Sequence, residues 1–151
     1  MTQAYTHRFT EVHQLAGTLD PATYNGPTIE YTPYVNLAHH QRGVFIVQVG
    51  TMGAASTLLC SLVQSTNANG TDAKSIGAVA DKLVILQQTE GDGNDTIAIE
   101  FRTDELDVNA GYCYIAGTVH VAGDVPLSAL LLLGGSNQLA VPTAMWTQIV
   151  D

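Results

Sequence analysis

Seven or eight short strand patterns separated by turn signals run through the chain, and no long segment has the period of an amphipathic helix. The clearest is "TIAIEFR" (Thr96–Arg102), where apolar residues alternate with polar or small ones, as in a strand with one buried face. "GVFIVQVG" and "STLLCSLVQS" are apolar on both faces, which is typical of central strands. Asn69-Gly70 is the strongest turn signal. These patterns predict an all-β protein: an antiparallel β-sandwich of jelly-roll type.

Leu83–Gln87, "YCYIAGTVHVAG" and "LSALLLLGG" are further predicted strands. We expect a sandwich domain over residues 31–135, preceded by an extended N-terminal arm (1–30) and followed by a C-terminal tail (136–151). Tyrosines and prolines are interleaved in the first third of the chain; proline stiffens an extended segment, and tyrosine supplies contact area with a polar tip. The alternative, loops folded onto the protein's own sandwich, is equally open.

The chain contains few charges. Charged residues make up 13% of it, against roughly 25% in typical domains, and the 29 residues of Gly43–Thr71 include none. A surface of this kind loses little hydration when it is covered, which favours extensive protein–protein contact. The net charge of −9 argues against direct binding to nucleic acid or to anionic membranes. Eight of the fourteen acids lie between Asp81 and Asp107, as a solvated acidic face or as a patch for a basic partner or cations.

The N-terminal residues lack a secretion-signal pattern, and "LSALLLLGG" is too short to span a bilayer. Two cysteines, Cys60 and Cys113, do not make a disulfide framework. We therefore expect synthesis in a reducing cytosol. The thiols are expected to be free and buried in strands, while a bond between them stays open if the two strands face each other closely.

No motif of a known catalytic or cofactor-binding class is present: there is no phosphate loop, Cys-x-x-Cys, His-Glu-x-x-His or Gly-x-Ser-x-Gly. Asp104, Glu105 and Asp107 could supply a carboxylate pair for glycoside hydrolysis, but no aromatic groove accompanies them. "EGDGNDT" lacks the spacing of a calcium loop and predicts a hairpin turn. The sequence therefore predicts no enzyme, no cofactor and no metal site.

Three histidines are candidate metal ligands. His39 and His40 are adjacent, so in a strand they would point to opposite faces, and we expect a loop or strand-end pair. His120 shares the more polar face of its predicted strand with Tyr112, Tyr114 and Thr118. It is expected on a surface or in an interface, where a histidine titrating near neutral pH could tune assembly.

One long segment resembles a known group of proteins. "LDPATYNGPTIEYTPYVNLAHHQRGVFIVQVGTMGAASTLLCSLVQSTNANGTDAKSIGA" is similar to small virion proteins of tailed bacteriophages, in which an apolar strand ending in "VG" precedes a Gly/Ala turn and a strand ending in "VQ". "DELDVNAGYCYIAGTVHVAG" and "ALLLLGG" match the later strands of that family. The resemblance extends from Leu19 to Gly135, and the uncharged tail has no match in it.

The resemblance implies a virion structural protein with a sandwich or jelly-roll fold, placed on the head surface as a capsid decoration (cement) protein and made in the host cytoplasm. Its expected partners are the major capsid protein and copies of itself, as a trimer or dimer. A neck, collar or tail position and a carbohydrate- or receptor-binding module are the alternatives. Aromatic and methionine side chains dominate interface energies, so the expected interface anchors are Tyr5, Phe9, Tyr24, Tyr31, Tyr34, Met145 and Trp146.

Overall fold

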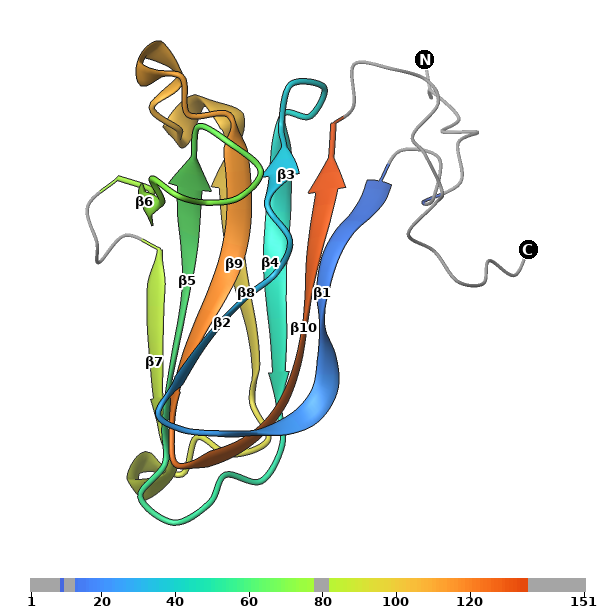
Figure 1. Ribbon diagram of the computed structural model, residues 1–151. Coiled ribbons are helices and arrows are strands. Elements are labelled where there is room, and N and C mark those ends of the chain that lie inside the picture. Colours follow the sequence, from blue (N-terminus) through green and yellow to red (C-terminus); the bar gives the residue numbers. More distant parts are fainter. Residues whose placement is uncertain (1–8, 10–12, 78–81, 136–151) are drawn as a thin grey trace.

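The computed structural model describes residue 9 and residues 13–77 and 82–135, which form two packed antiparallel sheets (Figure 1). The four-stranded sheet, here sheet A, has the order β1 (His13–Asn25), β10 (Asp124–Gly134), β4 (Arg42–Val49) and β8 (Thr96–Arg102). The six-stranded sheet, sheet B, contains β2 (Thr28–Tyr31), β9 (Tyr114–Ala122), β5 (Thr57–Ser65) and β6 (Lys74–Ser75), with β3 (Val35–Asn36) beside β9 and β7 (Leu83–Gln87) beside β5.

The connections identify the sandwich as a jelly roll. The eight longer strands pair as β1-β10-β4-β8 in one layer and β2-β9-β5-β7 in the other, all antiparallel. This is the double-sheet arrangement of two interleaved Greek keys. The prediction of an all-β, jelly-roll-like sandwich is confirmed. The two additional strands, β3 and β6, have two residues each.

The core lies between the two sheets, as the alternation in the sequence requires. In β8, Ile97, Ile99 and Phe101 face inward and are 7%, 6% and 1% exposed, as predicted. In β5, Leu58, Cys60 and Leu62 fill the core, while the residues between them lie half-buried on the outer face. The inward apolar residues of β5 therefore belong to the core, whereas its outward apolar residues belong to the outer face of sheet B.

The structure differs from the expected arm. Residues 13–25 form β1, which pairs with β10 at its edge of sheet A, and residues 28–31 form β2 at the edge of sheet B. Irregularities between Leu15 and Gly17 and between Leu19 and Ala22 break the alternation of β1. This part of the predicted arm belongs to the sandwich, because its inward residues, such as Leu19, are buried.

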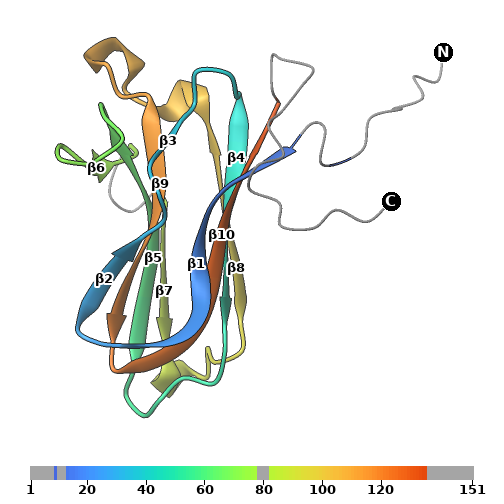
Figure 2. The ribbon, with the colours of Figure 1, turned by 45° about the vertical axis from the view of Figure 1, so that its right-hand side comes forward.

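Three short 3-10 helices, η1 (Gln88–Glu90), η2 (Thr103–Glu105) and η3 (Val108–Ala110), lie in the connections at the two ends of the sandwich (Figures 1 and 2). Within the described part of the chain, no helix is long and apolar enough to cross a membrane.

Candidate interaction surfaces

The outer face of sheet B forms the first candidate surface. The strand register aligns one row of side chains across four strands, Ile29–His120–Leu59–Ile85, and next to it a second row, Tyr31–Thr118–Ser61–Leu83. We call these eight residues the sheet B face. It contains no Asp, Glu, Lys or Arg, and its edge residues Ile29, Tyr31 and Ile85 are 50%, 45% and 51% exposed. Large apolar side chains are thus presented to solvent on a sheet face without charge.

Tyr34 and a tight turn lie beside Tyr31 of this face. The rings of Tyr31 and Tyr34 stack with centroids 6.2 Å apart, and the Tyr34 ring lies over Gly70, whose φ is +67°. Burial, the neighbouring Tyr31 and the Asp72 carboxylate together raise the pKa of Tyr34. The turn is held by Asp72, which accepts hydrogen bonds from the Ser65 hydroxyl and the Thr66 backbone N–H. The predicted Asn69-Gly70 turn is therefore present, and the Tyr34 ring packs on its glycine.

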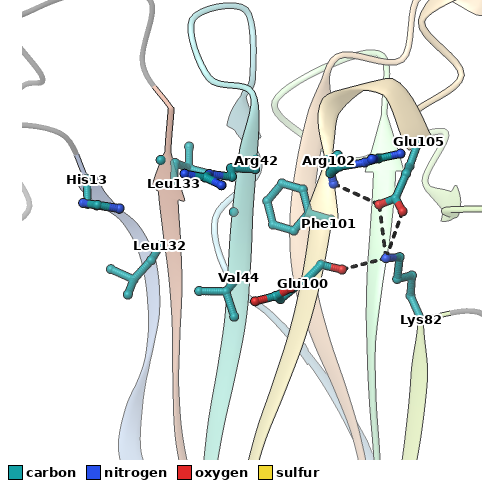
Figure 3. Close-up of a pocket in the computed structure, with 12 residues that line it drawn as sticks. His13, Arg42, Val44, Lys82, Glu100, Phe101, Arg102, Glu105, Leu132 and Leu133 are labelled. Atoms are coloured by element: carbon teal, nitrogen blue, oxygen red, sulfur yellow. Dashed lines mark hydrogen bonds and ion pairs between the residues drawn. The ribbon is translucent and has the colours of Figure 1, made fainter. Parts of the chain in front are cut away.

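The outer face of sheet A forms the second candidate surface. Its side chains align in three rows, in the order β1, β10, β4 and β8: His13–Gly134–Arg42–Arg102, Leu15–Leu132–Val44–Glu100 and Thr18–Leu130–Ile46–Ala98. The first row and three residues of the second, Leu132, Val44 and Glu100, border a cavity of about 450 Å³ (Figure 3). We call this cavity the sheet A groove. Half-buried Val44 and Leu132 form its outer apolar floor.

Charged residues border one end of the groove. Three of the chain's five Lys and Arg residues, Arg42, Lys82 and Arg102, line it. Lys82 Nζ donates to the Glu100 backbone carbonyl at 2.7 Å and pairs with Glu105 at 3.1 Å (Figure 3). Arg42 and Arg102 are directly opposite each other on neighbouring strands, an arrangement of like charges that is unfavourable by itself. In Figure 3 the Arg42 side chain points toward β10 and the Arg102 side chain toward Glu105.

The three carboxylates considered for acid–base chemistry are held in separate ion pairs. Asp104 pairs with Arg102 at 3.1 Å, Glu105 with Lys82 at 3.1 Å, and Asp107 with Lys74 at 2.8 Å. Burial opposes ionisation of Glu105, but hydrogen bonds from the Arg102 backbone N–H and from Lys82 outweigh it and lower the pKa.

The hydrogen bond from Lys74 likewise lowers the pKa of Asp107. Lowered pKa values favour permanent ionisation over proton donation. The arrangement is therefore suited to fixing the connection between β8 and β9.

The acidic segment between β7 and β8 forms a turn, as expected. Gly91 ends η1 with φ +86°, and the Asp92 carboxylate accepts a hydrogen bond from the Gln87 backbone N–H at 2.8 Å. Among the described residues, no group of three or more His, Cys, Asp or Glu is placed to hold a metal ion.

His39 and His40 lie in the connection that precedes β4, in agreement with the loop expectation. Both ring nitrogens of His40 are buried, with no hydrogen-bond partner among the described residues. Burial and the neighbouring His39 lower the pKa of His40. His120 is half-buried between Ile29 and Leu59 on the sheet B face, which matches its expected outward orientation.

Both cysteines are free. Cys60 faces the core, where burial raises the pKa of its thiol to about 12. Cys113 is half-buried immediately before β9, where Asn36 Nδ2 lies 4.0 Å from its Sγ. The expectation of a buried free thiol therefore holds fully for Cys60 and in part for Cys113.

Four of the seven predicted interface anchors lie in the described part of the chain. Tyr5, Met145 and Trp146 lie outside the described residues. Phe9 is 56% exposed, and its ring stacks on His13 with centroids 4.0 Å apart. Tyr24 packs against the core and donates to the Asp20 carbonyl at 3.0 Å. Among the anchors that the structure describes, only Tyr31 and Tyr34 come together.

Sequence reasoning missed the apolar outer residues of both sheets. They include Ile29, Ile85, Val44 and Leu132, and the available signal was a strand with apolar residues at successive positions. In such a strand half of the apolar residues point away from the core. An uncharged strand therefore predicts an outer face with few charges as well as a core.

No model of a known protein family matches the chain, and no curated protein matches it in sequence. Two structures of Triatoma virus show a distant likeness. The first, "Structure of Triatoma Virus (TrV)", has a TM-score of 0.49 at 14% identity over 95% of this chain and 72% of that chain. The second, an X-ray structure of the empty capsid, has a TM-score of 0.45 at 13% identity over 91% of this chain and 99% of that one. Neither likeness by itself assigns a function to this chain.

Proposed function

We propose that the protein is a structural component of a virion. In the finer form of the proposal, it decorates the head of a tailed bacteriophage, bound to the major capsid protein and to further copies of itself. The observation on which the proposal depends is the sheet B face. In a chain with a net charge of −9, four strands together present an outer surface with no charged side chain and with three exposed large residues, Ile29, Tyr31 and Ile85.

Such a face is suited to permanent contact. Covering it removes apolar area from water, at roughly 25 cal/mol per Å², and strips no ion of its hydration, which is the expensive part of burying a charged surface. Obligate interfaces are more apolar than ordinary protein surface. The exposed Tyr31 supplies the aromatic contact that often dominates the energy of an interface.

Fold and sequence agree with this proposal without deciding it. Jelly rolls occur in viral capsid proteins and in lectins, and a fold alone does not assign a function. The sequence resemblance to phage virion proteins covers most of the chain and favours a virion protein over a lectin. The ion pairs that occupy Asp104, Glu105 and Asp107 make an acid–base enzyme a weaker proposal.

The proposed mechanism is mass action. A protein that binds the assembled shell but not its separate subunits stabilises the shell by an amount that grows with the logarithm of its concentration over the dissociation constant. Each bound copy contributes to this stabilisation. The proposal places the protein on the head surface after synthesis in the host cytoplasm.

Cosedimentation with assembled shells of the cognate major capsid protein tests the proposal. Ile85→Lys introduces a charge at an exposed edge position of the expected contact and should abolish binding. Thr96→Lys introduces the same charge on an exposed outer position of sheet A and should leave binding unchanged. Circular dichroism verifies that both variants fold.

Binding of the parent protein to purified tails or necks, and not to heads, would move the proposal to those positions. No binding to any particle part would refute it.

A carbohydrate-binding role is the second candidate, because Tyr31 is exposed and stacked on Tyr34, as a sugar-binding platform requires. Aromatic residues elsewhere in the sandwich support it less. Phe45 and Phe101 are 0% and 1% exposed, and Lys74 lies 4.0 Å above the Tyr112 ring. Glycan-array binding that is lost in Tyr31→Ala, in a protein that does not bind shells, would favour this role.

A further inference from the structure

We infer that β8, which lies at one edge of sheet A, is the contact through which two copies of the chain associate. The two β8 strands pair antiparallel about a two-fold axis at Ala98, and the two A sheets become one continuous sheet. The inference deepens the proposed function, on which it rests for the role of this contact in a shell. It is tested on the protein alone, so that its failure is distinguishable from a failure to bind shells.

The backbone of β8 is hydrogen-bonded to a neighbouring strand on one side only. At its two ends, Val49 N–H donates to the Asp95 carbonyl and Thr103 N–H donates to the Gln41 carbonyl, each at 2.9 Å. Every second residue pair of an antiparallel ladder is hydrogen-bonded in this way, and the register between β4 and β8 is uninterrupted. The odd-numbered residues of β8 therefore bond to β4, and the even-numbered residues direct their N–H and C=O groups away from it.

The described residues occupy this outer edge at its C-terminal end only. The Glu100 carbonyl accepts a hydrogen bond from Lys82 Nζ at 2.7 Å, and the Arg102 N–H donates to the Glu105 carboxylate at 2.9 Å (Figure 3). No other group in the described part of the chain hydrogen-bonds to this side of the strand. Thr96 and Ala98 thus each present a free N–H and a free C=O, which together form a template for a further strand.

The opposite edge of the sandwich is blocked against such pairing, whereas β8 is not. β1 contains Pro21 and two register irregularities, and β2 has only four residues. Prolines, bulges and short strands are the features that prevent a further strand from adding to a sheet. The seven residues of β8 include no proline, and its register is regular. Of the two edges of sheet A, β8 is therefore the one that can accept a strand.

The space beside β8 indicates which kind of strand it accepts. A cavity of about 460 Å³ lies between β8 and β7, the neighbouring edge strand of sheet B, and it is lined by Lys82, Leu83, Val84, Ala98, Ile99 and Glu100. A strand added to β8 directs every second side chain toward sheet B, where the cavity lies, and the others toward the outer face of sheet A. The partner must therefore alternate apolar residues with small or polar ones. β8 itself has this alternation.

Pairing of β8 with its own copy about Ala98 suits both the backbone and the side chains. The free N–H and C=O of Ala98 meet those of the second copy, and Thr96 lies opposite Glu100 of the second copy. On the inward face, Ile97 lies opposite Ile99 of the second copy, and such cross-strand pairs of branched apolar residues stabilise a sheet. This register places no two like charges opposite each other. The contact is self-complementary, as a two-fold interface requires.

Sedimentation equilibrium of the full-length protein, without any shell, tests the inference. We expect a reversible dimer that dissociates on dilution. Ala98→Pro removes the central N–H of the contact, and proline is tolerated in an edge strand where the N–H points away from the sheet. This variant should fold, as circular dichroism verifies, and remain a monomer. Ala98→Ser is the matched control, because it keeps the N–H and should dimerise as the parent does.

Charges at position 96 test the register. Thr96→Glu places a carboxylate opposite Glu100 of the second copy and should weaken the dimer several-fold, because like charges directly opposite each other destabilise a sheet. The double variant Thr96→Glu/Glu100→Thr has the net charge of the parent and removes the repulsion, so it should restore dimerisation. Thr18→Glu controls for net charge, since it adds the same charge at an exposed position of β1; it should leave the dimer nearly unchanged.

A parent protein that is a monomer at every concentration would overturn the inference, and so would a dimer that persists in folded Ala98→Pro. If Ala98→Pro does not fold, the charged variants decide. Weakening by Thr96→Glu with rescue in the double variant supports pairing of β8, and equal effects of Thr96→Glu and Thr18→Glu refute it. Dimers that do not bind shells would refute the proposed function alone, and shell binding by a strict monomer would refute this inference alone.

Discussion

The ring of Phe45, from β4 of sheet A, lies against Gly117 of β9 in sheet B. A Cβ atom at Gly117 would be 2.2 Å from Cε2 of Phe45, and Phe45 is 0% exposed. The contact joins the two layers at the centre of the core. A large side chain from one sheet thus occupies the space that a missing side chain leaves in the other.

Gly117→Ala should destabilise the protein by about 1–3 kcal/mol, the usual cost of adding a methyl group to a packed core. Urea unfolding measures the change in the free energy of unfolding. The double variant Gly117→Ala/Phe45→Leu should be less destabilised than the sum of its two single variants, because the smaller side chain makes room for the methyl group. Additive effects would contradict the direct contact.

Alanine substitutions at Gly70 and Gly91 separate the cost of backbone strain from the cost of a side-chain clash. Gly70 and Gly91 both have positive φ, but a Cβ at Gly70 would be 2.3 Å from the Tyr34 ring, whereas one at Gly91 meets nothing within 4 Å. Gly91→Ala should cost about 1–2 kcal/mol from the left-handed conformation alone. Gly70→Ala should cost clearly more in the same urea titration, since Tyr34 must also move. Equal costs would show that Tyr34 moves freely.

The two thiols should differ in reactivity. With a pKa of about 12 and complete burial, Cys60 provides almost no thiolate at pH 8, and the thiolate is the reactive form. Titration of the native protein with Ellman's reagent should therefore modify Cys113 first and leave Cys60 unmodified until denaturant is added. Cys113→Ser provides the control and should show no rapid reaction. Rapid modification of that variant would mean that the core around Cys60 opens readily.

Acid should destabilise the end of the sandwich that carries β6 and the β8–β9 connection. Hydrogen bonds from Ser65 and Thr66 lower the pKa of Asp72, and the hydrogen bond from Lys74 lowers that of Asp107. A carboxylate whose folded pKa is lowered adds stability above its unfolded pKa, near 3.8, and that stability is lost as the pH falls through the folded value. The melting temperature should therefore decrease when the pH is lowered below about 4.

Lys74→Gln provides the comparison for this acid dependence. Without its ammonium group the pKa of Asp107 should return toward its ordinary value, and the melting temperature at neutral pH should fall toward the value in acid. A variant whose melting temperature depends on pH just as the parent's does would show that the pair does not contribute to acid sensitivity.

The strands that could be predicted from the sequence are those whose side chains alternate without interruption. β8 has three buried residues at every second position, and Leu83–Gln87 is β7 with the same limits. β1 could not be predicted in the same way, because its register shifts at Leu15/Gly17 and Leu19/Ala22. After a bulge, the residues that previously pointed outward in the alternation point inward. Its partner, β10, is also the most distant strand in the chain.

The candidate surfaces were less predictable than the strands. The lack of charge in Gly43–Thr71 indicated contact surface, but the sequence could not show that Ile29 and Ile85 would occupy one row with His120 and Leu59. That row depends on the order of strands in the sheet, which local patterns do not specify. Two of the expected anchors that the structure describes are separated for the same reason: Tyr24 lies on β1 and Tyr31 on β2, in different sheets.

The position of β10 determines when the fold can be completed. The last described strand of the chain is an inner one, since it lies between β1 and β4 (Figure 2). During synthesis β1 leaves the ribosome first and then has no partner until β10 follows, and pairings this distant in sequence form slowly. A chain terminated before Asp124 leaves β1 and β4 without the strand that joins them. Closure of the sandwich therefore requires β10, the last of the described strands to be synthesised.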